Sequence, residues 1–411
     1  MRLKSLCLAT VASFCLAPAM TRAQPAIDDD ATVVHLRVDC SLPGSTYLDN
    51  CFEDTDDLTD WLWDGGRNSA PSSSDRVFVQ VGPGDFDPIR CANDGYVSFV
   101  GSGREHTRFV HTNSHANNAA IDTSDCDGLS FANLAAVSIR DDTAAGVWWR
   151  GTGNGTWLGV DAIGQGTDPN AAVYGWYDTG SSSDTIVQYI FDSRIMAEGE
   201  GTLFIGYDAG ASEVWFYGGQ ISVQPSGSGS ILAAIGVFAP SPTTAGTDTS
   251  FFVFGTSIRV LGANYSGTVT GRGSGLVGGL RGVYLSQGST FHMHGGIINV
   301  TGTGPSGNVD VEGIGTSDAN DFAHTPGTSF VIKAGGSGTA RRLNVGAGTV
   351  QSPYVWPASS TAPTALSQHG SDAFVDTAAG SGSDEAHLMI YDTTCASGGG
   401  PWRDMVDGAC R

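Results

Sequence analysis

Three short segments repeat a pattern of aromatic and imidazole side chains that could bind a sugar chain. They are EVWFYGGQISVQ from Glu213, SFFVFGTSIRVLG over 250–262, and TFHMHGGIINVTG over 290–302. Successive residues of a β-strand point to opposite faces, so alternate positions of each segment should form outward columns. The expected columns are Trp215, Phe252 and His292 in one, and Tyr217, Phe254 and His294 in the other.

Neighbouring residues extend this surface. Aligning QYIFDSRI with VWFYGGQI adds Tyr189 and Phe191 one coil earlier, and Arg259 should point outward from the strand that follows the second segment. Aromatic rings combine a large apolar area with, in Tyr and Trp, a polar group, which suits a glycan. An exposed apolar strip could equally bind a second copy of the chain. The predicted binding residues are Tyr189, Trp215, Tyr217, Phe252, Phe254, Arg259, His292 and His294.

His292 and His294 alternate on one strand and share a face, as two metal ligands could. They also stand at positions that hold aromatic rings in the two earlier segments. We favour the ladder of stacked rings and predict no metal site.

Two acidic residues and an arginine are the candidates for catalysis. Asp141 and Asp142 follow a predicted strand, and carboxylates about 5 to 10 Å apart can share acid and base roles in glycoside cleavage. A lyase would instead need Ca²⁺ held by acidic residues and an arginine base, for which Arg194 is the candidate. No cofactor is required otherwise. The sequence leaves open whether a bound glycan is also cut.

The spacing of the repeated segments predicts a solenoid that would carry these residues. The first three copies start 37 and 40 residues apart, and a fainter copy, SFVIKAGG, starts at Ser329, 39 residues after Thr290. Such a period is typical of stacked coils, each of which buries its apolar face only against the next. The positions expected inside are Val214, Phe251, Phe291, Phe216, Val253, Met293, Ile221, Ile258, Ile298, Val223, Val260 and Val300.

Phrases near the start of the coils resemble a known family of solenoids. RVFVQVGPGDF over 76–86, YVSFVGSG over 96–103 and GLSFANLAAVSI over 128–139 are similar to the opening coils of the pectin-lyase-like superfamily. The resemblance covers residues 76–348 and implies an all-β fold, a right-handed parallel β-helix. It implies no particular activity, because activity is grafted separately onto such folds.

The catalytic motifs of related carbohydrate-active families are incomplete here. Polygalacturonases have Gly before a catalytic-site His and carry Arg-Ile-Lys, whereas His294 follows Met293 and no Arg-Ile-Lys occurs. SFFVFG over 250–255 is similar in shape to a pectin methylesterase phrase, but Phe stands where that family has its catalytic Asp. The resemblance therefore does not choose an activity.

The first 23 residues are typical of a cleavable secretory signal, with Arg2 and Lys4 before an apolar run over 6–19. No later stretch has the roughly 18 uninterrupted apolar residues of a membrane helix. Losing three basic residues with the signal would move the formal charge from −22 to −25, which repels nucleic acid and anionic lipid. We expect an exported protein, secreted, periplasmic or on the cell surface, with no nucleic-acid partner and no membrane insertion.

Six cysteines remain after the signal, and an even number in an exported chain predicts disulfides. Several pairings are open, and closeness in sequence favours Cys40 with Cys51, Cys91 with Cys126, and Cys395 with Cys410. A short helix over 54–64 is expected in an N-terminal cap over 24–75. The β-helix should follow over 76–350, then a linker over 351–371 and a disulfide-closed β cap over 372–411.

These features predict a secreted β-helix protein that recognises a polysaccharide, with cleavage by lyase or glycoside hydrolase chemistry left open. The alternative is a non-catalytic adhesin or surface structural protein, which the incomplete catalytic motifs favour. In that case the outward ladder would serve attachment or oligomer assembly.

Overall fold

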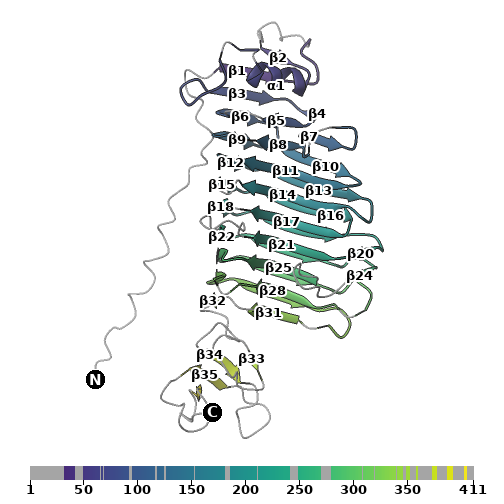
Figure 1. Ribbon diagram of the computed structural model, residues 1–411, viewed down its shortest axis with the longest axis vertical. Coiled ribbons are helices and arrows are strands. Elements are labelled where there is room, and N and C mark those ends of the chain that lie inside the picture. The colour runs from purple at the N-terminus through teal and green to yellow at the C-terminus, as the bar shows by residue number, and fades with distance from the viewer. Residues whose placement is uncertain are drawn as a thin grey trace, which may run out of the picture.

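The computed structural model of the chain describes residues 32–351 and, beyond them, four further short strands. Inside that range it leaves out 42–49, 65, 68, 92–94, 116–117, 125, 152, 181–185, 211, 241–248, 270–278, 308, 319, 339 and 346–348. Three long parallel sheets run down the described chain (Figure 1). Each coil adds one strand to sheet 1, then sheet 2, then sheet 3, so the fold is the predicted parallel β-helix.

The strands of each sheet lie in the order of the coils. Sheet 1 contains β2 (Cys51–Phe52), β1 (Thr32–Leu36), β3 (Val77–Val81), β6 (Val97–Val100), β9 (Leu129–Ala132), β12 (Asn154–Leu158), β15 (Ile186–Phe191), β18 (Ser212–Tyr217), β22 (Ser250–Phe254), β26 (Thr290–His294), β29 (Phe322–His324) and β32 (Thr349–Gln351). Sheet 2 contains β4 (Gly84–Phe86), β7 (Thr107–Thr112), β10 (Ala135–Arg140), β13 (Asp161–Thr167), β16 (Arg194–Glu200), β19 (Gln220–Pro225), β23 (Ser257–Leu261), β27 (Ile297–Thr301) and β30 (Ser329–Lys333). Sheet 3 contains β5 (Ile89–Cys91), β8 (Ile121–Ser124), β11 (Thr143–Gly151), β14 (Ala172–Gly180), β17 (Leu203–Gly210), β21 (Ala233–Pro240), β25 (Gly279–Ser286), β28 (Val311–Thr316) and β31 (Ala340–Val345).

Two smaller sheets complete the described strands. A parallel pair joins β20 (Ser230–Ile231) to β24 (Thr268–Val269). The four strands beyond residue 351 form a sheet of their own, in which β34, β35 and β36 pair antiparallel. Their bounds are β33 (Ala358–Ser359), β34 (Ala373–Asp376), β35 (His387–Tyr391) and β36 (Trp402–Asp404).

The three clear repeats are aligned as the sequence predicts, and the faint fourth copy is not. Glu213, Ser250 and Thr290 lie opposite one another in sheet 1. Ser329 does not continue that row, because it pairs with Ile297 in sheet 2. SFVIK therefore aligns with IINVT, and the sheet 1 strand of that coil is β29. The misalignment arose because SF at 329–330 repeats the SF of 250–251 while coil length varies.

The interior of the coils is filled by the predicted apolar columns. All twelve residues expected inside, from Val214 to Val300, are fully buried. Burying one such side chain stabilises a fold by about 1.5–3 kcal/mol, so the columns are a main source of stability. In earlier coils the same row holds larger rings, with Phe99 stacked on Phe131 at 5.0 Å and Phe131 on Trp157 at 4.4 Å between ring centroids.

A two-residue corner joins sheet 1 to sheet 2 in the six coils from β9–β10 to β26–β27. Its first residue has a left-handed backbone, with φ of 63° at Gly255 and 45° at Asp192. Gly adopts this conformation without strain, and Asp and Asn tolerate it. The corner keeps a fixed spacing between the two strands on either side, which explains why the repeat is visible in the sequence.

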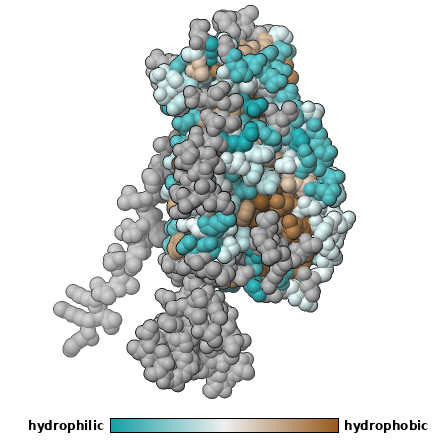
Figure 2. Space-filling model, in the orientation of Figure 1, coloured by the Kyte–Doolittle hydropathy of each residue, from teal (hydrophilic) through white to brown (hydrophobic). Residues whose placement is uncertain are grey.

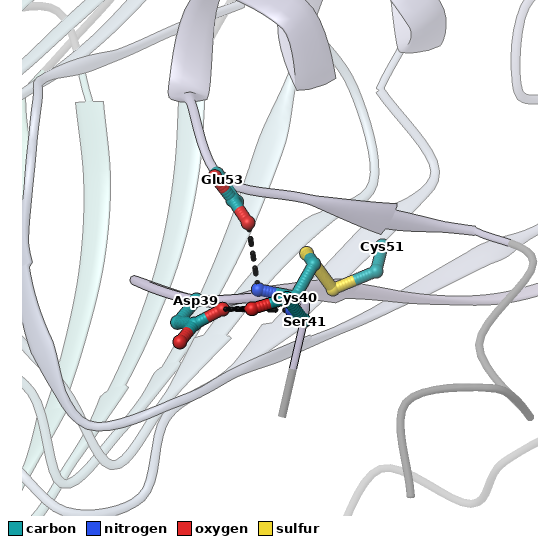
Figure 3. Close-up of a disulfide and its surroundings, with 5 residues drawn as sticks. All are labelled: Asp39, Cys40, Ser41, Cys51 and Glu53. Atoms are coloured by element: carbon teal, nitrogen blue, oxygen red, sulfur yellow. Dashed lines mark hydrogen bonds between the residues drawn. A yellow bond between two sulfur atoms is a disulfide. The ribbon is translucent and has the colours of Figure 1, made fainter. Parts of the chain in front are cut away.

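A helical cap and two disulfides close the N-terminal end. Helix α1 (Thr55–Trp63) starts after Asp54, whose side chain accepts a hydrogen bond from the Asp56 backbone N–H. Leu58 and Leu62 pack on the core. The Cys40–Cys51 disulfide ties the end of β1 to β2, beside a hydrogen bond from the Cys40 N–H to the Glu53 carboxylate (Figure 3).

The second disulfide, Cys91–Cys126, links two successive coils. Both predicted N-terminal pairings are thus confirmed, and they are compatible with an exported protein. The predicted signal over 1–23 and the pair Cys395 and Cys410 lie outside the described residues. Among the described residues, no helix has the length and apolar character needed to cross a membrane.

Candidate functional site

The outer face of sheet 1 carries the two columns that the sequence predicts. Tyr189, Trp215, Phe252 and His292 lie opposite one another on β15, β18, β22 and β26. The second column runs beside it on the same four strands and consists of Phe191, Tyr217, Phe254 and His294. We call these eight residues together with His324 the aromatic ladder.

The rings from Trp215 to His292 in the first column, and from Phe191 to His294 in the second, are stacked face to face along the solenoid axis. In the first column, the centroids of Trp215 and Phe252 are 4.2 Å apart with planes 14° from parallel, and Phe252 and His292 are 5.0 Å apart. In the second, Tyr217 lies 4.8 Å from Phe254, which lies 5.3 Å from His294. These spacings follow the separation of neighbouring strands. Because ring faces contact the neighbouring rings, the ladder presents mainly ring edges outward.

A third histidine continues the aromatic ladder and was missed by the sequence prediction. His324 lies opposite His292 in β29, with ring centroids 6.0 Å from His292 and 5.8 Å from His294. Its ring is nearly perpendicular to both of them. The alternation Phe322-Ala-His324 matches the spacing of His292-Met-His294, so a repeat search that allowed shorter coils could have found it.

The exposure of the rings differs along the aromatic ladder. Tyr189 is 41 % exposed and His294 is exposed, whereas Trp215 is half-buried. The indole N–H of Trp215 donates to the Glu213 carboxylate at 2.6 Å, which fixes the orientation of that ring. Arg259 is not part of this surface, because it belongs to β23 in sheet 2, where its Nε donates to the Ser257 hydroxyl at 2.9 Å.

Burial in the stack, and then the neighbouring imidazoles, lower the pKa of both His292 and His294 below the ordinary value of 6.5. Protonation is therefore easier in the unfolded chain than in the ladder. The stability that these residues contribute is present above pH 6.5 and is lost as pH falls through their lowered pKa values.

Replacing both residues by Phe, as in the preceding coil, should make the protein less sensitive to acid. The double variant His292→Phe, His294→Phe removes two groups that must otherwise gain a proton on unfolding in acid. We expect its melting temperature to fall less between pH 7 and pH 5 than that of the wild type, measured by circular dichroism. His106→Phe, at an exposed histidine away from the ladder, should retain the wild-type difference. Equal acid sensitivity of all three proteins would contradict this interpretation.

The candidate catalytic residues lie far apart. Arg194 lies opposite Asp161, which in turn lies opposite Ala135 at the start of β10, whereas Asp141 and Asp142 follow the end of that strand. At about 3.3 Å per residue, the carboxylates lie about 20 Å from the start of the strand along its direction. The structure therefore does not bring Arg194 and the two acids into one site.

Asp142 and Arg194 each form an ion pair with another residue. The Asp142 carboxylate accepts two hydrogen bonds from Arg140, at 2.6 and 2.8 Å, and this guanidinium lowers the pKa of Asp142 to about 2. Such a carboxyl stays ionised near neutral pH and cannot serve as a general acid. Arg194 pairs with the buried Asp161, which a second arginine, Arg104, also contacts at 3.4 Å. These contacts hold the arginine in a structural role.

Within the described part of the chain, no group of three or more His, Cys, Asp and Glu side chains is arranged to hold a metal ion. No protein-family model, curated protein or solved structure matches the chain.

Proposed function

We propose that this protein binds a polysaccharide without cleaving it, and that the aromatic ladder on sheet 1 is its attachment surface. One observation carries the proposal, namely the unbroken row of parallel rings that crosses four neighbouring strands from Phe191 to His294. The row combines apolar ring edges with tyrosine hydroxyl and imidazole groups. That mixture suits a chain of sugars, which offers C–H groups and oxygens in alternation.

The stacking geometry favours long chains over short ones. Since the ring faces contact each other, a sugar meets mostly ring edges, which carry partial positive charge and attract oxygen atoms. Each such contact is weaker than stacking on an open ring face. A polymer that lies along the solenoid axis meets a new strand about every 4.8 Å and gathers many weak contacts in one molecule. We therefore expect strong retention by polysaccharides and weak binding of short oligosaccharides.

Binding without cleavage agrees with the positions of the candidate catalytic residues. Asp142 is held ionised by Arg140, and Arg194 is held by Asp161 at the other end of the strands of sheet 2. Neither lies on sheet 1, where the aromatic ladder is found. A sugar chain on the aromatic ladder is thus remote from Asp142, whereas Arg194, two corner residues beyond Phe191, is held in its ion pair with Asp161.

Removing the centre of the aromatic ladder should weaken binding at this surface. In Trp215→Ala, Phe252→Ala the closest stacked pair is lost, and two aromatic contacts of about 1 kcal/mol each correspond to an affinity loss of about tenfold or more. Affinity electrophoresis in gels containing neutral or uronate polysaccharides measures this loss. Val331→Ala, at an exposed residue of sheet 2, should leave retention unchanged, and thermal unfolding checks that both variants fold.

Two parallel measurements decide between this proposal and its rivals. Wild-type protein incubated with the same polysaccharides, with and without Ca²⁺, should release neither reducing nor unsaturated ends, and release of either would show catalysis. Sedimentation of the wild type and the double variant tests assembly. If the variant changes its mass but retains polysaccharide binding, the aromatic ladder is a subunit contact and the proposal is wrong.

A further inference from the structure

The outer face of sheet 3 carries a second column of outward side chains, with one acid at its centre. Neighbouring strands β11, β14, β17, β21 and β25 place these residues opposite one another in register. We call them the sheet 3 column, and they are Trp148, Tyr177, Asp208, Phe238 and Tyr284. The inward positions next to them, such as Tyr207 and Val237, are fully buried in the core.

Apolar and aromatic groups surround the acid on both sides. The Tyr177 ring lies 4.7 Å from that of Tyr174 and 5.0 Å from that of Trp148, and Phe238 lies 5.9 Å from Tyr284. Ile235 and Leu203 lie beside the sheet 3 column in an apolar cluster separate from the core, and the buried Ile205 lies opposite Ile235. Figure 2, in the orientation in which sheet 3 faces the viewer, shows a brown apolar patch over the middle of this sheet.

Asp208 is nine-tenths buried and has no hydrogen-bond donor among the described residues. It is 6 % exposed. Two other buried acids show how this chain usually satisfies a carboxylate. Asp178 accepts from Trp176, Tyr207 and Ser212. Asp122 accepts from the Arg150 guanidinium at 2.7 Å. Asp208 has neither kind of partner, so its carboxyl group is available to a ligand.

The surroundings of Asp208 favour its neutral form. Burial, and then the negative charge of Asp178 beneath it, raise the pKa of the Asp208 carboxyl well above its ordinary value. The titratable groups that face it are the Tyr174 and Tyr177 hydroxyls on β14, while β21 presents only Ile235 and Phe238. The nearest cations on this face belong to strands two positions away, β11 and β25. A protonated carboxyl can donate a hydrogen bond, whereas an ionised one only accepts.

We propose that the sheet 3 column is a second binding site, for an uncharged saccharide, in which the Asp208 carboxyl group donates a hydrogen bond to a sugar oxygen. The aromatic and aliphatic side chains on either side contact the apolar C–H surface of the sugar. An anionic sugar is disfavoured, because its charge would be desolvated beside apolar groups and an uncharged carboxyl, with no cation among the described residues of either neighbouring strand. This site is on a different sheet from the aromatic ladder and does not depend on it.

Two substitutions of Asp208 separate hydrogen bonding from charge. Asp208→Asn keeps a neutral group that can donate, and Asp208→Leu keeps a similar volume without a donor. Both are made in the Trp215→Ala, Phe252→Ala background, so that any remaining binding cannot come from the aromatic ladder. Calorimetric titration with cellohexaose, xylohexaose and mannohexaose measures binding, and thermal unfolding confirms that the variants fold.

We expect at least one of these neutral sugars to bind the parent, Asp208→Asn to bind within about threefold of it, and Asp208→Leu to bind about tenfold more weakly, since a lost hydrogen bond costs about 1–1.5 kcal/mol. Glu105→Leu, at an exposed acid, should bind as the parent does. Difference infrared spectra of the parent and Asp208→Asn at pH 7 should show the band of a protonated carboxyl. Absence of that band, absence of binding to all three sugars, or equal binding by Asp208→Leu would overturn the proposal.

Discussion

Gly282→Ala is expected to destabilise the β-helix severely, although it adds a single methyl group. A Cβ atom at this position would lie 2.4 Å from Cγ2 of Ile298 and 2.6 Å from the carbonyl oxygen of Gly313. Both neighbours are held by the stack, since Ile298 is fully buried and Gly313 belongs to the next strand of sheet 3. Overpacking of this kind costs about 1–3 kcal/mol, and the backbone oxygen can move only by breaking sheet pairing. The midpoint of urea unfolding measures the loss.

Gly82→Ala is the matched control for this prediction. A Cβ atom there would meet nothing closer than Cγ of Arg37 at 3.4 Å, and its backbone φ is ordinary. Alanine at such a site reduces the freedom of the unfolded chain and should leave stability unchanged or raise it by a few tenths of a kcal/mol. If the two variants unfolded at the same urea concentration, the close contacts at Gly282 would not lower the free energy of unfolding, and the prediction would be wrong.

Gly282 belongs to a column of glycines that runs down sheet 3. Its members occur once in each of six successive coils, and they are Gly146, Gly175, Gly206, Gly236, Gly282 and Gly313. In β25 the residue before Gly282 is Arg281, whose guanidinium lies 4.5 Å from the ring centroid of the outward-facing Tyr284, and the residue after it, Val283, is fully buried in the core. Strict alternation would place both on the same face. The alternation therefore changes at the glycine in every coil, while the register between neighbouring strands is the same on both sides of it. The close packing of neighbouring coils leaves no room for a side chain there.

These glycines explain why sheet 1 could be predicted from the sequence and sheet 3 could not. The strands of sheets 1 and 2 are joined by a two-residue corner, so their apolar positions recur at a constant spacing within each segment. Sheet 3 follows after connections of unequal length, and its alternation changes phase at the glycine. From β3 onward the register distance between coils also varies, from 20 residues between Val77 and Val97 to 46 between Ala233 and Gly279. A fixed period therefore placed Ser329 in the wrong sheet.

The sequence predicts the candidate site only where it depends on the alternation of side chains between the two faces of a strand. The two columns of the aromatic ladder follow from strand geometry, and their members were identified. Whether ring faces or edges are open depends on the tilt of each ring, which the sequence does not encode locally. Likewise, Asp141, Asp142, Asp178 and Asp208 look alike in sequence. They differ in desolvation and in hydrogen-bond donors that come from other coils, 29 or more residues away in the case of Tyr207 and Ser212.

Asp178 shows how strongly those distant groups decide the behaviour of an acid. Its side chain points from β14 into the core of the β-helix and is 1 % exposed. Its carboxylate accepts hydrogen bonds from the Trp176 indole at 2.6 Å, the Tyr207 hydroxyl at 2.7 Å and the Ser212 hydroxyl at 3.0 Å. Burial outweighs all three and raises the pKa of Asp178 from 3.8 to about 7. The folded chain therefore holds a proton that the unfolded chain releases in mildly acidic solution.

Replacing Asp178 by Asn should remove a pH-dependent loss of stability. Because the pKa of Asp178 is raised from 3.8 to about 7 on folding, its stabilising contribution is complete below pH 3.8 and is lost as pH rises to 7. The full change amounts to about 4 kcal/mol, since each unit of pKa corresponds to about 1.4 kcal/mol. Urea unfolding of the wild type and Asp178→Asn at pH 4, 5.5 and 8 should give a stability difference that shifts in favour of the variant as pH rises. The lowered pKa of Asp142 makes stability rise with pH instead. Because both proteins contain Asp142, its contribution cancels in the stability difference. The free energy of unfolding of Asp141→Asn, which changes an exposed acid, should depend on pH as that of the wild type does. If Asp178→Asn also followed the wild-type pH dependence, the Asp178 carboxyl would be ionised in the folded wild-type protein.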